Sequence, residues 1–278
     1  FGSTSNESHI VRHAYLRADD HMQKQYSEST SLFAIDIETG ELLWQYNALN
    51  SIRHNAVTIG RERIFLIDRV MAVDDLLANA PARRGEKPQQ PATEHATGEL
   101  IALDLKTGER DWKADKDVFG TTLSYSKEHD ILLMFYQPTA FRLPSEVGGR
   151  IAAFQAASGD KLWETKVAYN TRPLINGDTI IAHPVALDLV SGEAKPMAIP
   201  RSYGCGQVTG SQNLLMFRSG TLGYYDFTRD AGTENYGGIR PGCWINALPV
   251  GGLVLVPDAT AGCVCSYQNR SWMALGGK

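Results

Sequence analysis

Residues 32–44 read LFAIDIETGELLW, and this stretch decides the fold because it recurs along the chain. A second copy, IALDLKTGERDW, occupies residues 101–112, and a third, IAAFQAASGDKLW, occupies residues 151–163. A weaker copy, VALDLVSGEAK, lies at residues 185–195. The shared pattern is an apolar segment, then Asp-x-x-Thr/Ser-Gly, then a segment that carries Trp in the first three copies. Such internal self-similarity indicates a repeat architecture.

Each copy predicts two strands that are joined by a tight turn. The first half alternates apolar and polar residues, as a half-buried strand does. A glycine supplies the positive φ that the turn needs, at Gly40, Gly108, Gly159 and Gly192. The Asp of each copy, replaced by Gln155 in the third, can accept backbone N–H bonds across the turn. We expect Trp44, Trp112 and Trp163 to be largely buried, as wedges between neighbouring sheets.

A second type of hairpin fills the gaps between the copies, at residues 54–68, 120–136, 172–183, 205–218 and 243–258. Two successive hairpins make a four-stranded antiparallel sheet, which is one blade of a β-propeller. We therefore predict an all-β fold, a β-propeller with about five to six blades in this chain, treated as a single domain over residues 1–278. The partial blade before Ser51 takes its inner half from residues 9–16 or lacks it. Residues 70–96 carry three prolines among many polar residues, which predicts a surface insertion.

The bulk composition excludes several classes of protein. The net charge is −4 and charged residues make up 21% of the chain, which does not suggest nucleic-acid binding. No apolar run reaches the ~18 residues that a membrane-spanning helix needs. The sequence also contains no phosphate-binding loop, no Gly-x-Ser-x-Gly and no His-Glu-x-x-His.

The repeated Ala-Leu-Asp-x-x-Thr-Gly-x-x-x-Trp units resemble those of PQQ-like β-propeller proteins, over roughly residues 30–200. That superfamily includes quinoprotein alcohol dehydrogenases and the propeller lipoprotein of outer-membrane β-barrel assembly. A narrower group, the large PQQ-like envelope proteins of planctomycete-type bacteria, is resembled by residues 1–3, 52–56, 117–121, 240–244, 251–258 and 263–269. In that group further blades precede the corresponding region. The resemblance therefore implies the C-terminal part of a longer protein, with a propeller that another segment completes.

The resemblance leaves two functions to weigh. Quinoprotein dehydrogenases stack the quinone on a Trp, bind Ca²⁺ through Glu and Asn, and commonly carry a disulfide between adjacent cysteines. This sequence has no Cys-Cys pair, and no set of residues is assigned to those roles by spacing. We therefore expect no cofactor and a non-catalytic binding or scaffold module. The alternative is a quinoprotein with PQQ and Ca²⁺, or a metal-assisted enzyme, with its site at the mouth of the central channel.

Four cysteines cluster near the end of the chain: Cys205, Cys243, Cys263 and Cys265. In an extended segment, Cys263 and Cys265 point to one face about 6–7 Å apart, where a direct bond between them would be strained. We expect Cys205 and Cys243 each to form a disulfide with one member of that pair. Such bonds place a protein outside the cytoplasm. A Zn²⁺ site of all four thiolates is the alternative metal site, and free thiols are a third reading.

The innermost strand of each blade lines the channel, so the first residues of the inner hairpins are the candidates for a site. They are Arg53, His54, Asn55, Thr121, Arg172, Cys205, Cys243 and Trp244, together with Arg218 at the end of another strand. Arg53 and Arg172 can form a basic funnel for an anion, and His54 can act as a base or metal ligand. The alternative for His54 and Asn55 is hydrogen bonding between blades. We expect a protein or glycan partner, no nucleic acid, no membrane span, and a periplasmic or secreted location.

Overall fold

The structure is a computed structural model of the chain. It describes residues 1–8, 10–11, 25–71, 75, 98–137, 145–202, 204–229, 231–243, 245–259 and 266–277. In these residues every regular element is a strand of an antiparallel sheet, and none is an α-helix. The chain divides into two compact units, residues 1–168 and residues 169–278, and each is described by itself.

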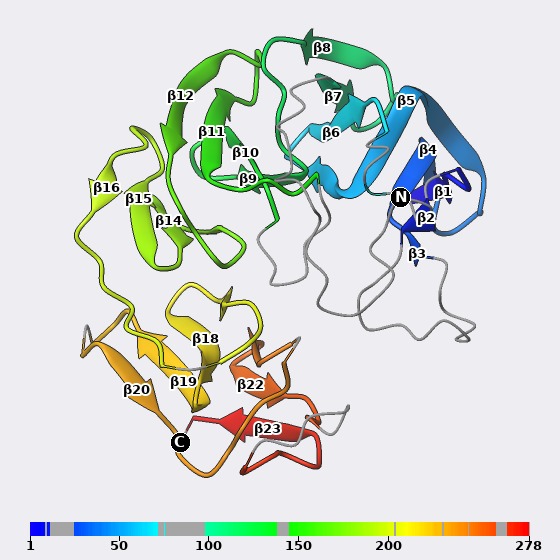
Figure 1. Cartoon of the computed structure of the whole chain (residues 1–278). Coiled ribbons are helices and arrows are strands. Elements are labelled where there is room, and N and C mark those ends of the chain that lie inside the picture. The colour runs from blue at the N-terminus through cyan, green and yellow to red at the C-terminus, as the bar shows by residue number, and fades with distance from the viewer. Residues whose placement is uncertain are drawn as a thin grey trace. The chain divides into compact units, whose positions relative to one another are not determined.

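The first unit contains three blades (Figure 1). Its strands are β1 (Gly2–Ser5), β4 (Glu28–Ile35), β5 (Leu42–Ile59), β6 (Arg63–Arg69), β7 (Gly98–Asp104), β8 (Arg110–Ala114), β9 (Thr122–Ser126), β10 (Ile131–Phe135), β11 (Arg150–Gln155) and β12 (Lys161–Lys166). The order β1-β4-β5-β6-β7-β8 joins two blades in one ladder, and β9 to β12 form the third. A separate two-stranded ladder pairs β2 (Ile10–Val11) with β3 (Gln25–Tyr26).

Strand β5 belongs to two blades at once. Its first part pairs with β4, and its last part pairs with β6 across a shift in register between Ile52 and Val57. The buried carboxylate of Asp68 stabilises the part of β5 where the strand passes from one blade to the next. It accepts hydrogen bonds from three successive backbone N–H groups and from one hydroxyl, those of Leu49, Asn50, Ser51 and Tyr46. One strand thus serves as the outermost strand of the first blade and the innermost strand of the second.

The strand beside β4 corrects one expectation. The inner half of the first blade was expected to come from residues 9–16 or to be missing. Instead β1 pairs with β4, in the register Gly2↔Phe33 to Ser5↔Ser29. Within the predicted segment, Ile10 and Val11 pair with β3 instead, and residues 9 and 12–16 lie outside the described residues. Short distance along the chain was therefore a poor guide to strand pairing here.

The second unit contains three further blades. Its strands are β13 (Leu174–Asn176), β14 (Thr179–Ala182), β15 (Val185–Asp188), β16 (Ala194–Lys195), β17 (Thr209–Gly210), β18 (Leu214–Ser219), β19 (Thr221–Asp226), β20 (Thr233–Asn235), β21 (Leu248–Val250), β22 (Leu253–Val256) and β23 (Met273–Gly276). They form two four-stranded sheets and one three-stranded sheet. The described residues therefore hold six blades, four of them with four strands, as the predicted propeller class requires.

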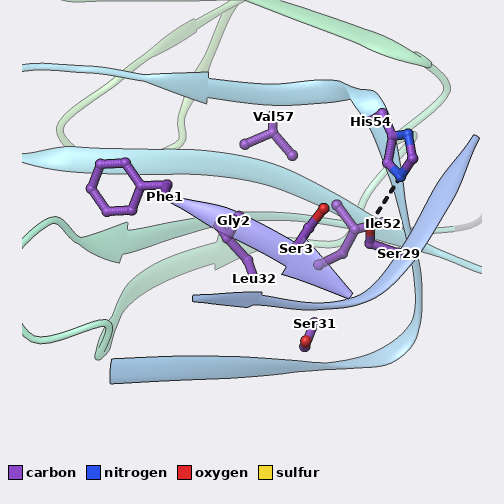
Figure 2. A pocket seen from close by; sticks show the side chains of 9 residues that line it. All are labelled: Phe1, Gly2, Ser3, Ser29, Ser31, Leu32, Ile52, His54 and Val57. Atoms are coloured by element: carbon purple, nitrogen blue, oxygen red, sulfur yellow. Dashed lines mark hydrogen bonds between the residues drawn. The ribbon is translucent and has the colours of Figure 1, made fainter. Parts of the chain in front are cut away.

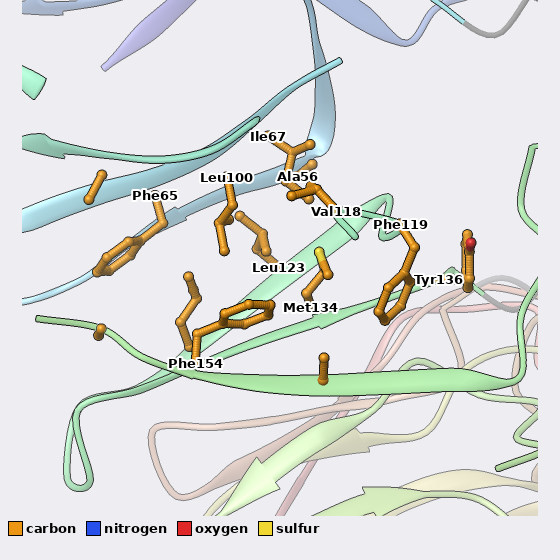
Figure 3. Packing of buried hydrophobic residues seen from close by; sticks show 14 residues of the cluster. Ala56, Phe65, Ile67, Leu100, Val118, Phe119, Leu123, Met134, Tyr136 and Phe154 are labelled. Carbon is orange, nitrogen blue, oxygen red and sulfur yellow. The ribbon is translucent and has the colours of Figure 1, made fainter. Parts of the chain in front are cut away.

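Interior blades are buried on both faces, which the alternating pattern did not indicate. In β6, Ile64 and Leu66 pack toward the first blade, while Phe65 and Ile67 pack toward the third. Figure 3 shows the second of these cores, where Phe65 and Ile67 face Phe154 and the side chains around it. Because neither face meets water, such strands read as continuous apolar runs.

The repeated turns form as predicted. Gly40, Gly108, Gly159 and Gly192 all have positive φ, between 71° and 80°. In each turn the glycine N–H donates to the carbonyl four residues back, at 2.8–2.9 Å. The carboxylates of Asp36, Asp104 and Asp188 each accept two further backbone N–H bonds. These bonds, led by those from Thr39, Thr107 and Ser191, hold the pKa of the three carboxyl groups below its ordinary value.

Trp44 and Trp112 pack between blades, although the repeat tryptophans are less completely buried than expected. Trp44 is buried at 7% exposure, whereas Trp112 and Trp163 are partly exposed. The Trp44 indole N–H donates to the Leu105 carbonyl at 3.2 Å, and that of Trp112 donates to the Ala156 carbonyl at 3.0 Å. Each indole thus binds the turn of the next blade along the chain.

Candidate functional site

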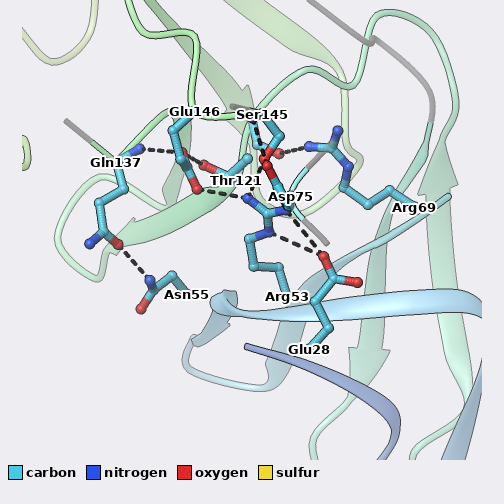
Figure 4. Close-up of polar contacts among 10 residues, drawn as sticks. Glu28, Arg53, Asn55, Arg69, Asp75, Thr121, Gln137, Ser145 and Glu146 are labelled. Atoms are coloured by element: carbon cyan, nitrogen blue, oxygen red, sulfur yellow. Dashed lines mark hydrogen bonds and ion pairs between the residues drawn. The ribbon is translucent and has the colours of Figure 1, made fainter. Parts of the chain in front are cut away.

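Arg53, the first channel-mouth candidate, lies at the centre of a buried charge cluster in the first unit (Figure 4). Its guanidinium contacts Glu28 Oε1 at 3.1 Å, Asp75 Oδ2 at 2.8 Å and Glu146 Oε1 at 2.8 Å. It also donates to the Ser145 hydroxyl at 2.8 Å. The side chains of Arg53, Glu28 and Asp75 are at most 3% exposed, so this is a desolvated ion cluster rather than a surface pair.

The positive charge of Arg53 is compensated by carboxylates of its own chain. Burial by itself lowers the pKa of Arg53, but the carboxylates of Glu146, Asp75 and Glu28 outweigh it and raise that pKa above the ordinary value. Arg53 therefore offers no free guanidinium, which corrects the expected anion-attracting funnel at this residue. Arg172 belongs to the second unit.

The cluster ties distant segments to the inner strand of the second blade. Asp75 accepts from the Ser145 N–H at 2.9 Å, and Glu146 binds the Thr121 hydroxyl and the Gln137 N–H. Asp75 lies within residues 70–96, which were predicted to be a surface insertion. Asp75 is buried, while residues 72–74 and 76–96 lie outside the described residues. The arrangement can anchor the segments that flank the sheets.

A second cation, Arg69, is buried close to the cluster. Its Nη1 reaches the Gly120 carbonyl at 3.5 Å. Burial lowers the pKa of Arg69, and the neighbouring charge of Arg53 lowers it further. Figure 4 places both guanidinium groups beside Asp75 and Ser145.

His54 and Asn55 are exposed and hydrogen-bonded to neighbouring strands and loops. His54 Nε2 lies 2.9 Å from the Ser29 hydroxyl, and the Asn55 amide donates to the Gln137 side chain. Figure 2 shows His54 at the rim of a pocket of about 200 Å³. The pocket is lined by Phe1, Gly2, Ser3, Ser29, Ser31, Leu32, Ile52, His54 and Val57. These contacts fit the structural alternative for both residues.

In the second unit the candidates gather on two adjoining loops. Buried Arg218 donates through Nη1 to the Cys243 sulfur at 3.4 Å, and its backbone N–H donates to the Asn246 side chain at 2.9 Å. The Asn246 amide in turn donates to the Gly242 and Cys205 carbonyls. Asn246 thus holds the two cysteine-bearing loops together.

The remaining candidates are less informative. The Arg172 backbone N–H donates to the Gln207 side chain at 2.6 Å, and Arg172 is partly buried. Trp244 lies outside the described residues. Among the residues that the structure describes, no three His, Cys, Asp or Glu side chains are grouped so that they can hold a metal ion. Nor does that part of the chain contain a helix long and apolar enough to cross a bilayer.

Arg240 contrasts with Arg53. It is 2% exposed, yet none of its three guanidinium nitrogens has a hydrogen-bond partner within the described ranges. Its backbone alone is bonded there, to Tyr267 and Asn269.

The cysteine prediction remains to be tested. Cys205 is exposed and Cys243 is partly buried, and the two are not bonded to each other. Cys263 and Cys265 lie outside the described residues. We expect alkylation without reductant, followed by mass spectrometry, to find Cys205 and Cys243 each linked to one of those two residues. Four alkylated thiols would contradict this expectation, and zinc bound by all four would favour the metal alternative.

A family model described as outer membrane protein assembly factor BamB matches residues 9–195. The chain belongs to this PQQ-like repeat family. The match includes the four turn motifs and extends from the first unit into the second. It supports the predicted superfamily, while the narrower planctomycete-type group stays a prediction.

The chain is also similar to solved structures. BamB from Moraxella catarrhalis is 17% identical with a TM-score of 0.49, and the match covers 83% of this chain and 74% of that one. A europium-containing methanol dehydrogenase is 11% identical with a TM-score of 0.45, and covers 82% of this chain and 62% of its own. No curated protein matches the sequence.

The structure thus brings together only part of the predicted set. Arg53, Asn55 and Thr121 meet through Glu146 and Gln137 in one unit, and Arg218 meets Cys205 and Cys243 through Asn246 in the other. Sequence reasoning missed the partners Glu28, Asp75, Ser145, Glu146 and Asn246. Nothing in their spacing marked them, because Glu146 lies 93 residues from Arg53.

Proposed function

We propose that this protein is a non-catalytic binding or scaffold module of the bacterial cell envelope that acts on another protein. The observation that carries the proposal is the commitment of Arg53 to three carboxylates of its own chain. A guanidinium held in this way stabilises the blade, and it is not presented to a substrate or cofactor. Membership of a family described by an outer-membrane assembly factor agrees with a role in contacts between proteins.

The polar residues near Arg53 support the same proposal. His54 and Asn55 bond to Ser29 and Gln137, which are structural contacts between segments of the unit. The pocket at His54 measures about 200 Å³, below the roughly 300–1,000 Å³ of typical small-molecule sites. A protein partner needs no such cavity, since it binds an extended surface.

The proposal extends to location and cofactor. Membership of the family supports an envelope location, and the disulfides that we predict would agree with it. The function proposed requires no PQQ, Ca²⁺ or Zn²⁺. A glycan partner is compatible with the same exposed surfaces, and it becomes an outcome of the binding experiment.

Two measurements test this function. The tagged protein, purified from its host, is analysed for quinone absorbance and for metals by elemental analysis. A stoichiometric quinone or transition metal would overturn the proposal. Envelope proteins that co-purify are then produced separately, and their Kd for the protein is measured. We expect a specific protein to bind, whereas binding of a glycan alone would contradict a protein partner.

The second unit offers a matched pair of variants for that measurement. Trp272 is 70% exposed, and tryptophan is the residue most enriched among binding hot spots. Val190 is 55% exposed in the same unit. We expect Trp272→Ala to weaken binding about 30-fold, equivalent to ~2 kcal/mol, and Val190→Ala to leave it unchanged. Equal binding by both variants would exclude Trp272 from the contact surface.

A further inference from the structure

A short loop that leads into β23 presents aromatic and basic side chains to solvent (Figure 1). It comprises residues 266–272 and belongs to the second unit. Tyr267 is 72% exposed and Trp272 is 70% exposed, and Arg270 between them is exposed as well. Binding hot spots are enriched in tryptophan, tyrosine and arginine, so these seven residues hold one of each type. We call residues 266–272 the aromatic loop.

Two other segments of the same unit hold the centre of the aromatic loop in place. The Arg240 N–H donates to the Tyr267 carbonyl at 3.0 Å, and the Asn269 N–H donates to the Arg240 carbonyl at 3.2 Å. The Ala259 N–H donates to the Asn269 carbonyl at 2.9 Å, and the Gln268 amide donates to the Ala259 carbonyl. A loop that is already fixed in this way loses little conformational entropy when it binds a partner.

Tyr267 has a backbone conformation that tyrosine rarely adopts. Its φ of 59° lies in the left-handed region, which glycine adopts far more readily. Its hydroxyl forms no hydrogen bond with any residue that the structure describes, and most of the ring is in water. Residues held in such conformations cluster at ligand clamps and other functional sites. The fold therefore imposes an unfavourable conformation on a side chain that contributes little to the core.

The charge of this region is positive, although the chain as a whole is acidic. Residues 235–278 contain three basic residues and one acidic residue, Asp258, whereas the whole chain has a net charge of −4. Arg270 forms no ion pair with any described residue, and the guanidinium of Arg240 has no hydrogen-bond partner among them either. One arginine lies in the aromatic loop and the other binds its backbone. The loop therefore complements a negatively charged partner.

We infer that the aromatic loop is the docking site for an acidic, extended segment of a partner protein. Tyr267 and Trp272 contact apolar side chains of that segment, and Arg270 pairs with one of its carboxylates. The two aromatic residues are five positions apart, at most about 18 Å of chain, so one segment of about six residues reaches both. The inference rests on the proposed function, to which it adds the surface used and the chemistry of the partner.

Photo-crosslinking in the protein as its host makes it tests the inference. p-Benzoylphenylalanine replaces Tyr267, which keeps an aromatic ring there, and crosslinked peptides are identified by mass spectrometry. We expect peptides of a second protein in which Asp and Glu outnumber Lys and Arg around the crosslink. Adding Arg270→Glu should lower the yield about tenfold or more. The matched control is Arg229→Glu, which should leave the yield unchanged, because Arg229 is exposed in the same unit but already paired with Glu234 at 3.4 Å.

Several outcomes of this experiment would overturn the inference. Crosslinks confined to other segments of this chain, to a glycan, or to neutral or basic peptides would exclude an acidic protein segment. A yield no higher than with the photo-probe at the exposed position Val190 would show that the aromatic loop has no partner. An equal loss of yield in both charge variants would exclude a specific role for Arg270.

A charge exchange gives an independent readout. The crosslinked segment is synthesised as a peptide, together with a version in which Lys replaces its Asp and Glu residues. We expect Arg270→Glu to bind the acidic peptide about tenfold or more weakly than the unchanged protein does, and to prefer the Lys version. Absence of that preference would refute the pairing of Arg270 with a carboxylate. If the whole partner protein binds Tyr267→Ala and Arg270→Glu with an unchanged Kd, this docking site is wrong while the proposed function stands.

Discussion

Replacing Arg53 with methionine is expected to lower the free energy of unfolding by about 3–5 kcal/mol, the cost of removing one partner from a buried ion cluster. The variant leaves Glu28, Asp75 and Glu146 close together without the cation that compensates them. Methionine retains most of the volume, so the loss reports charge rather than a cavity. The measurement is the urea unfolding midpoint at neutral pH, with the m value checked for constancy.

Arg240→Met is the matched control for this prediction. Both arginines are 2% exposed, but the guanidinium of Arg240 has no hydrogen-bond partner in the described part of the chain. Removing a buried charge that has no partner there also removes the cost of its desolvation, so Arg240→Met should lower the free energy of unfolding less than Arg53→Met does. A large loss of stability in Arg240→Met would instead reveal an anionic partner. If Arg53→Met costs no more than Arg240→Met, the carboxylate cluster does not stabilise the fold.

The contrast between these arginines explains why the candidate site was harder to predict than the fold. Arg53, Arg172 and Arg218 look alike in sequence, since each borders a segment that reads as a strand. Whether such a side chain faces water depends on carboxylates that fold back from other segments. The partners of Arg53 lie 22, 25 and 93 residues away, in segments without a repeat pattern. Sequence alone therefore located the inner strand but not the environment of its charges.

The repeated turn was predictable because its determinants are local. The glycine φ values and the Asp side-chain bonds form within five consecutive residues, so each copy specifies its own turn. Pairing between blades is not local. The long strand β5, the insertion of β1 next to β4 and the double-sided burial of β6 all depend on contacts between distant segments. The packing of Trp44 was predictable in part. The sequence indicated that this tryptophan would be buried between sheets, but it did not indicate that the indole would bind the turn at Leu105.

We expect Trp44→Ala to have the second large effect. It should lower the free energy of unfolding by about 3–5 kcal/mol, as truncation of a buried aromatic side chain does. The indole packs in the core between the first two blades, and its ring centroid lies 5.7 Å from that of Phe1. Trp44→Phe keeps most of the apolar contact but loses the hydrogen bond to the Leu105 carbonyl. We therefore expect this variant to lower the free energy of unfolding by only about 1 kcal/mol. Trp272→Ala, at an exposed position, should change stability by less than about 0.5 kcal/mol.

Two glycine variants distinguish the packing of the Trp44 indole from the backbone requirement of the turn. Gly40→Ala and Gly108→Ala impose a similar backbone cost of roughly 1 kcal/mol, because the two residues have φ values of 74° and 71°. Only at Gly108 does the new Cβ collide with the Trp44 ring, at 2.6 Å, whereas the Cβ at Gly40 meets nothing within 4 Å. The excess loss at Gly108 should disappear in a Trp44→Ala background, because the collision partner is gone. An excess that persists in the double variant would mean that the indole does not pack on this turn, and the blade interface would need another explanation.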